Sequence, residues 1–299
     1  MSHTLITPPI NRLCLKGSEF VEVNGGFNLR LSCFLGLLAL NQAPLGFPYT
    51  HVQPSEHRSS NLLVGVSVPA IARQVTVRII ASQGTGSGVI IKHQGQTYTV
   101  LTCNHVVDDN QDKHYTILTA DGLKHSGEWL RSAQFGNTDL ALVQFTSSQP
   151  YRVAVVGSNA LSIGDMTYAA GFPSWQSTKS DAVDDTRDWG MRAFRITKGK
   201  VAMLPKKSLQ QGYQIGFTND VEQGMSGGPV LNQSGQLVGI SGGLKHPLQG
   251  IIAFTFADGS VPSQKIFQQM DALSWAIPLA PFQSVAGQQQ RSPSHDSEI

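Results

Sequence analysis

The chain has 299 residues, of which 40% are hydrophobic and 14% charged, and its formal net charge is +2 at pH 7. The apolar content excludes a wholly disordered chain. So small a charge gives no reason to expect nucleic acid or an anionic membrane surface as the main partner. No apolar run approaches the roughly 20 residues of a membrane-spanning helix, which excludes an ordinary membrane protein. The length allows one large domain or two small ones.

Residues 1–60 form an N-terminal segment with an apolar run at 31–40, directly after Arg30. A short apolar run behind a basic residue is typical of a secretory signal peptide and predicts a periplasmic or secreted protein. Two features fit this poorly: 30 residues precede the run, and Pro44 disfavours cleavage of the bond before it. A translation start near Leu29 would give a conventional signal peptide, and a buried helix or strand is the alternative interpretation.

Residues 61–256 alternate short β-type runs with Gly, Asn, Asp and Ser, a pattern that predicts an all-β protein. The predicted strands do not alternate with helices, which argues against a parallel sheet. One helix is predicted over residues 263–275, where apolar side chains recur on one face. We expect a long surface loop at residues 178–188 and a polar tail at residues 281–299, disordered over its last part. The predicted strands are 75–80, 88–92, 97–101, 115–118, 140–145, 166–171, 194–202, 214–217, 229–231, 237–241 and 251–256.

The three cysteines, Cys14, Cys33 and Cys103, are too few for a disulfide-stapled scaffold. No cluster of cysteine and histidine has the spacing of zinc ligands. We therefore expect no metal and no organic cofactor. Cys103 is expected to pack in the core rather than to react.

Residues 224–229 (GMSGGP) place a serine among glycines directly before an apolar strand. Glycines allow the backbone to turn sharply and to approach a ligand closely. The amides of Gly224 and Ser226 could then converge on one point and hold a developing oxyanion. A tight turn without any function is the alternative interpretation of the same residues.

A nucleophilic serine needs a base, and His105 is the best placed of nine histidines because it follows the apolar strand 97–101. Asp139 begins another apolar strand and is the carboxylate expected to orient this histidine. His, Asp and Ser in this chain order is the order found in chymotrypsin. Surface positions are expected for the other histidines, although His246 could border a substrate cleft.

The chain resembles the trypsin-like serine proteases, and most closely their HtrA-like bacterial branch, over about residues 70–256. The resemblance implies two antiparallel six-stranded β-barrels with the active site between them. The first barrel would comprise residues 61–165, and the second would comprise residues 166–280 with the C-terminal helix. The matching stretches are 86–91 (GSGVII), 102–107 (TCNHVV), 138–141 (TDLA), 224–230 (GMSGGPV) and 237–241 (LVGIS).

The same resemblance implies roles for individual residues. It implies His105 as general base, Asp139 as the carboxylate that orients it and Ser226 as nucleophile. The amides of Gly224 and Ser226 would form the oxyanion hole. The segment of Ser241, Gly242 and Gly243 would pair with the substrate backbone as an added strand.

Three features bear on how far the resemblance extends. About 20 residues follow residue 279, which leaves no room for the PDZ domain that HtrA proteases usually carry. Met225 stands where trypsin has an aspartate that pairs with a newly cut N-terminus, so we expect no activation of that kind. Asp220 lies six residues before Ser226, the spacing of the carboxylate at the base of trypsin's primary pocket, which favours substrates with Arg or Lys. A loop aspartate in a turn with Asn219, and a preference for small apolar residues, are the alternatives.

The predicted function is that of a serine endopeptidase that acts on polypeptide substrates through an acyl-enzyme. An alternative from a different class is a catalytically silent double barrel that binds peptides or unfolded proteins. The presence of all three triad residues argues against this second interpretation. An esterase acting on small acyl groups would use the same residues. The sequence does not indicate an oligomeric state.

Overall fold

The computed structural model describes residues 66–279 except 83, 109–113, 132, 134, 158–160 and 178–181, and in addition residue 282. The apolar run 31–40 and residues 283–299 of the polar tail lie outside the described residues, so the signal peptide and the disordered tail stay predictions. Within the described part of the chain, no helix is long and apolar enough to cross a membrane.

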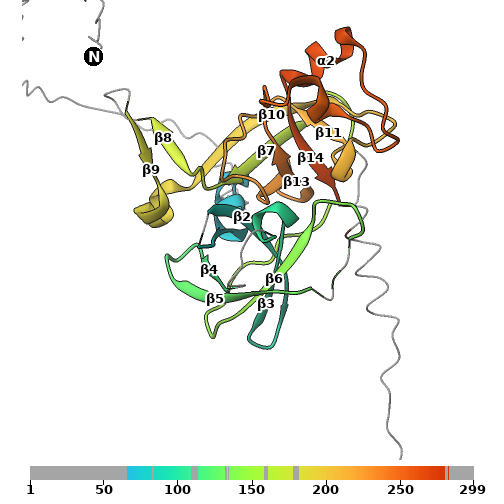
Figure 1. The fold of residues 1–299 in the computed structure, drawn as a ribbon. Coiled ribbons are helices and arrows are strands. Elements are labelled where there is room, and N and C mark those ends of the chain that lie inside the picture. The colour runs from blue at the N-terminus through green and yellow to red at the C-terminus, as the bar shows by residue number, and fades with distance from the viewer. Residues whose placement is uncertain are drawn as a thin grey trace, which may run out of the picture. The chain divides into compact units, whose positions relative to one another are not determined.

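The first six strands close into an antiparallel barrel in the order β1-β2-β3-β6-β5-β4 (Figure 1). Alternating residues of these strands point inward, and apolar side chains from β1 to β6 fill the centre. Closure of the barrel leaves no unpaired strand edge. The strands are β1 (Thr76–Ile80), β2 (Thr85–Gln94), β3 (Thr97–Thr102), β4 (His114–Leu118), β5 (Lys124–Trp129) and β6 (Ala141–Thr146).

The second barrel has the strand order β10-β11-β14-β13-β12-β7 and is also closed and antiparallel. The predicted all-β double barrel is thereby confirmed. A separate two-stranded hairpin, β8 with β9, extends from the second barrel (Figure 1). The strands are β7 (Met166–Gly171), β8 (Trp175–Ser177), β9 (Val183–Asp185), β10 (Arg195–Met203), β11 (Ile215–Phe217), β12 (Pro229–Asn232), β13 (Leu237–Gly243) and β14 (Ser274–Pro278).

The helices are short, and all but the first lie between strands. Helix α1 precedes the first barrel with a proline in its first turn, a position where the missing N–H is harmless. Its buried residue Val75 was expected to begin a strand. The helices are α1 (Val68–Val75), η1 (Asn104–Val106), η2 (Arg187–Ala193), η3 (Gln210–Gly212), η4 (Gly250–Phe254) and α2 (Gln264–Asp271).

Three predicted elements need correction. The helix expected over residues 263–275 ends at Asp271, because the following residues pair as β14 with β11 and β13. The strand expected at residues 251–256 is mostly the 3-10 helix η4, which has no strand partner. The loop expected at 178–188 contains strand β9 and the start of η2. In the first case, pairing with distant strands outweighed the local helical pattern.

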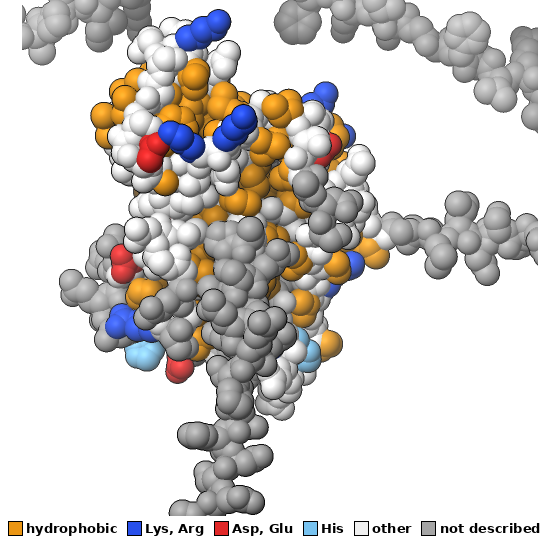
Figure 2. All heavy atoms as spheres, turned by 90° about the vertical axis from the view of Figure 1, so that its right-hand side faces the viewer, with side chains coloured by type: hydrophobic (Ala, Val, Ile, Leu, Met, Phe, Trp, Pro, Cys, Tyr) orange, Lys and Arg blue, Asp and Glu red, His pale blue; other side chains and the backbone are white. Residues whose placement is uncertain are grey.

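Several large hydrophobic side chains of the second barrel lie on its surface. Figure 2 shows hydrophobic side chains gathered over the upper part of the molecule, with lysine and arginine side chains among them. Exposed large hydrophobic residues of this barrel are Leu248, Ile252, Val261 and Ile266.

The strands of the two barrels lie on either side of residue 165. The division into domains of residues 61–165 and 166–280 stays a prediction.

The core assignment can be tested at Phe217 of β11, which is completely buried in the second barrel. Phe217→Ala leaves a cavity, and we expect the free energy of unfolding to fall by about 3–5 kcal/mol. Denaturant titration measures this change. Val155→Ala, at a residue that is 58% exposed, is the control and should stay within about 0.5 kcal/mol of the wild type. An unchanged unfolding midpoint for Phe217→Ala would contradict the assignment.

Candidate active site

Strand register brings His105 next to Asp139. His105 lies in η1 directly after β3, and Asp139 lies just before β6. The two strands pair antiparallel, with Thr102 opposite Ala141, so the end of β3 and the start of β6 are neighbours. Nδ1 of His105 lies 2.6 Å from Oδ2 of Asp139, and the His105 backbone N–H donates to Oδ1 at 2.9 Å.

The Asp139 carboxylate is only 3% exposed and accepts a third hydrogen bond, from the Tyr213 hydroxyl at 2.6 Å. Burial by itself raises the pKa of this carboxyl group. Hydrogen bonds from His105 and Tyr213, and the charge that His105 can carry, outweigh burial and hold the pKa of Asp139 below its ordinary value. The ionised carboxylate keeps a proton on Nδ1 of His105, which leaves Nε2 free to accept one.

Ser226 lies in the turn that leads into β12 and is almost completely buried. Its hydroxyl donates to the Gly242 carbonyl at 3.4 Å. No hydrogen bond joins Ser226 to His105 among the described residues, so the structure pairs His105 with Asp139 but does not pair His105 with Ser226. Such contacts are often long in enzymes without substrate and tighten when substrate binds.

The turn around Ser226 needs its glycines. Gly224 and Gly227 have φ angles of 92° and 84°, in the left-handed region. A Cβ on Gly227 would lie 2.2 Å from the Ser87 carbonyl oxygen, which belongs to the first barrel. Neither the Gly224 nor the Ser226 amide donates a hydrogen bond to another described group. The turn therefore presents two unengaged donors, as expected of an oxyanion hole.

The segment predicted to pair with substrate has two parts. Ser241 is completely buried, and its hydroxyl donates to the carbonyls of Met225 and Gly228 at 3.2 and 3.1 Å. It thereby holds the turn around Ser226. Gly242 and Gly243 line an open pocket beside His105 instead. Substrate pairing along Ser241, Gly242 and Gly243 stays a prediction.

This pocket has a volume of about 570 Å³, and His105, Tyr213, Leu248 and Phe254 lie in its walls. His246 also borders it, as its place after β13 suggested, and its Nδ1 lies 2.6 Å from the Asp271 carboxylate. Leu248 is fully exposed at the rim. The pocket can accept apolar side chains of a peptide next to the proposed base.

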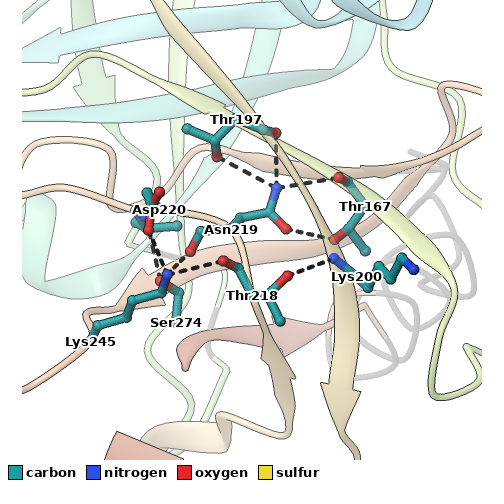
Figure 3. A network of polar contacts seen from close by, with 9 residues as sticks. Thr167, Thr197, Lys200, Thr218, Asn219, Asp220, Lys245 and Ser274 are labelled. Atoms are coloured by element: carbon teal, nitrogen blue, oxygen red, sulfur yellow. Dashed lines mark hydrogen bonds and ion pairs between the residues drawn. The ribbon is translucent and has the colours of Figure 1, made fainter. Parts of the chain in front are cut away.

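The expected role of Asp220 at the base of a primary pocket needs correction. Its side chain is 78% exposed and forms an ion pair with Lys245 (Figure 3). The preceding residue, Asn219, points inward instead: its amide donates to the carbonyls of Thr197 and Thr167 at 2.8 and 3.3 Å. The alternative of a loop aspartate beside Asn219 describes this arrangement better. Asp220 consequently supplies no buried carboxylate for a cationic substrate.

Cys103 is completely buried beside the site, and its thiol donates to the Ser241 carbonyl at 3.4 Å. Burial, and in second place the charge of Asp139, raises the pKa of this thiol well above its ordinary value. Donor atoms of Cys103, His105 and Asp139 lie within 4.8 Å of one another, a spacing that a metal ion could bridge. The Asp139 carboxylate among them already accepts three hydrogen bonds, from the ring and backbone of His105 and from Tyr213. The absence of a metal stays a prediction.

Sequence reasoning missed Tyr213. It lies between η3 and β11, outside every matched motif, and its hydroxyl reaches Asp139 from the second barrel. Burial, followed by the charges of its neighbours, raises the pKa of Tyr213 well above the ordinary value, so the phenol stays a donor. An aromatic residue before a short strand carries no sequence signal for such a role.

Tyr213→Phe removes this donor and keeps the ring. We expect the pKa of Asp139 to rise toward its ordinary value. A depressed carboxyl pKa stabilises the fold above the unfolded-state pKa, and this contribution is lost as the pH falls through the folded-state pKa. The variant should lose about 1.5–3 kcal/mol at neutral pH. Its free energy of unfolding should also depend less steeply on pH between about pH 5 and pH 2.

Urea unfolding at a series of pH values measures both effects. Tyr151→Phe is the matched control, because the Tyr151 hydroxyl donates to the exposed carboxylate of Asp121 at 3.0 Å. Identical pH profiles for the wild type and Tyr213→Phe would contradict the assignment.

Comparisons with known proteins agree with this geometry. Residues 86–240 match the family of the trypsin-like peptidase domain. The periplasmic pH-dependent serine endoprotease DegQ of Escherichia coli (strain K12) is 31% identical over 192 residues, which are 63% of this chain and 37% of DegQ. The periplasmic serine endoprotease DegP of the same organism is 29% identical over 189 residues, 62% of this chain and 35% of DegP. The chain thus spans little more than a third of these relatives.

A crystal structure of the serine endoprotease from Yersinia pestis has the same fold. It superposes with a TM-score of 0.50 at 19% identity and covers 76% of this chain and 67% of that chain. The family match covers more than half of this chain and includes both sides of the site. The chain therefore belongs to the family of the trypsin-like peptidase domain.

Proposed function

We propose that this protein is a serine endopeptidase that uses His105, Asp139 and Ser226. The observation that carries the proposal is the buried, ionised Asp139 carboxylate bound to the ring and backbone of His105. That pair lies across the barrel junction from a serine turn with two unengaged amides. A geometry that fixes the tautomer of the base and offers donors to an oxyanion is what acyl transfer requires.

In this mechanism the Ser226 hydroxyl attacks the scissile carbonyl while Nε2 of His105 removes its proton. Asp139 holds the ring and stabilises the imidazolium that forms. The amides of Gly224 and Ser226 donate to the oxyanion of the tetrahedral intermediate. His105 then gives the proton to the leaving amine, and the acyl-enzyme is hydrolysed by a water molecule that the same histidine activates.

Polypeptides are the proposed substrates. DegQ and DegP are named serine endoproteases, and the pocket beside His105 offers apolar walls to side chains near the scissile bond. Because Asp220 is exposed and paired with Lys245, the structure does not support selection of Arg or Lys by this carboxylate. Both relatives are also named periplasmic, which supports export of this chain.

Reaction with a fluorophosphonate probe tests the proposal directly. We expect the wild type to be labelled on Ser226, because a paired His105 makes this hydroxyl nucleophilic. Ser226→Ala and His105→Ala should abolish labelling, and Ser226→Ala should lower peptide hydrolysis by roughly 10⁴–10⁶-fold. Ser234→Ala, at an exposed serine in the turn after β12, should leave both unchanged.

Mass mapping of the labelled peptide and hydrolysis of casein provide the two readouts. No labelling and no hydrolysis by folded wild-type protein would overturn the proposal and favour a silent peptide-binding barrel. Ester hydrolysis without peptide hydrolysis would indicate an esterase instead.

A second test concerns Cys103, which lies two residues before the proposed base. Because its thiol is completely buried, Cys103→Ser should retain most of the hydrolytic activity. Steady-state kinetics of the purified variant measure this. A folded Cys103→Ser protein without activity would show that the thiol takes part in the reaction.

A further inference from the structure

The peptide bond between Gln223 and Gly224 carries one of the two proposed oxyanion donors. Its carbonyl oxygen accepts a hydrogen bond from the Ser174 amide at 2.7 Å. Peptide bonds in the described chain are trans, and a trans peptide directs its N–H and C=O to opposite sides. Ser174 therefore directs the Gly224 N–H away from itself, to the side where no described group accepts it.

Ser174 also packs tightly against this turn. A Cβ on Gly224 would lie 2.4 Å from the Ser174 hydroxyl oxygen and 2.6 Å from its backbone nitrogen. On the other side, the Ser87 hydroxyl donates to the Gly224 carbonyl at 2.8 Å. A shift of Ser174 would consequently free the Gln223 carbonyl and allow the peptide to rotate.

Ser174 is held in turn by Thr186, which lies directly after β9 and is buried. The Thr186 amide donates to the Ser174 carbonyl at 3.0 Å. Its hydroxyl donates to the Pro173 carbonyl. These bonds join the two ends of the segment that contains the β8–β9 hairpin.

Thr186 is fixed by an arginine from the other barrel. Arg78 of β1 is completely buried; its Nη1 donates to the Thr186 carbonyl at 2.7 Å, and its Nη2 donates to the Thr186 hydroxyl at 2.9 Å. The guanidinium also lies over the Phe172 ring, 5.9 Å from its centroid.

No carboxylate forms an ion pair with Arg78 among the described residues, and its Nε has no partner there. Burial lowers the pKa of this guanidinium, and the negative charges of Asp185 and Asp188 oppose that effect from beyond salt-bridge distance. A buried cation without a direct salt bridge is costly. A contribution to stability alone therefore explains the buried Arg78 poorly. Both terminal nitrogens of Arg78 donate to Thr186, so a role in positioning Thr186 explains it better.

We propose that Arg78 is a positioning residue for the oxyanion hole. It reaches from the first barrel to Thr186, Thr186 holds Ser174, and Ser174 orients the peptide that carries the Gly224 amide. The residue before the nucleophile, Met225, is completely buried and cannot form an ion pair that would do the same. The inference rests on the proposed function, because it adds a residue to that reaction.

Kinetics of Arg78→Met test the proposal, because methionine fills much of the site but cannot donate to Thr186. Loss of one oriented oxyanion donor should lower kcat for peptide hydrolysis by roughly 10²–10³-fold. KM and the midpoint of the acid limb of the pH profile should stay the same, since His105 and Asp139 are untouched. Arg152→Met is the matched control: Arg152 is exposed and, among the described residues, donates to the Gln74 side chain at 3.1 Å, so kcat should not change.

Thr186→Val keeps the carbonyl that Arg78 binds and removes the hydroxyl bond to Pro173. This variant should also lower kcat by roughly 10²–10³-fold. Circular dichroism shows whether each variant folds. If Arg78→Met does not fold, the kcat of Thr186→Val tests the proposal. Folded variants with wild-type kcat, or with a changed KM or acid limb alone, would overturn the proposal. If the wild type itself neither hydrolyses peptide nor reacts with the fluorophosphonate, the proposed function fails and the inference with it.

Discussion

The Asp139 carboxylate is buried at the junction of the barrels, where a negative charge is tolerable only if several donors reach it. The ring and backbone of His105 supply two donors from the first barrel, and the Tyr213 hydroxyl supplies the third from the second barrel. One ion therefore both orients the His105 ring and ties the two barrels together. Burial raises the pKa of Asp139, but these donors outweigh burial, so the pKa lies below its ordinary value and the ionised form is favoured.

The turn around Ser226 depends instead on close packing of backbone, which glycines without side chains allow. Gly227 leaves space for the Ser87 carbonyl, and Ser87 in turn donates to the Gly224 carbonyl. The proposed chain from Arg78 to Ser174 works across the same junction. The site is thus assembled from loops whose positions are determined by two rigid barrels and by the polar contacts between them.

Asp220 illustrates why spacing along the chain is a weaker guide to specificity than to the reaction. The position six residues before Ser226 is occupied by a carboxylate, yet the loop turns so that Asn219 takes the inner position. Asn219 satisfies buried strand groups, while Asp220 pairs with Lys245 in solvent. The pocket beside His105 is therefore the proposed place of substrate selection.

The sequence by itself determined the all-β class, most strands, the glycine-rich turn and the pairing of His105 with Asp139. These features depend on periodicity and turn chemistry among neighbours, and on strand ends that adjacent pairing brings together. The role of Tyr213 and the inward turn of Asn219 needed the tertiary structure, and so did the end of α2. Tyr213 bonds a carboxylate 74 residues away, and Arg78 bonds a threonine 108 residues away. Such contacts arise only when the barrels close and pack, so no local pattern records them.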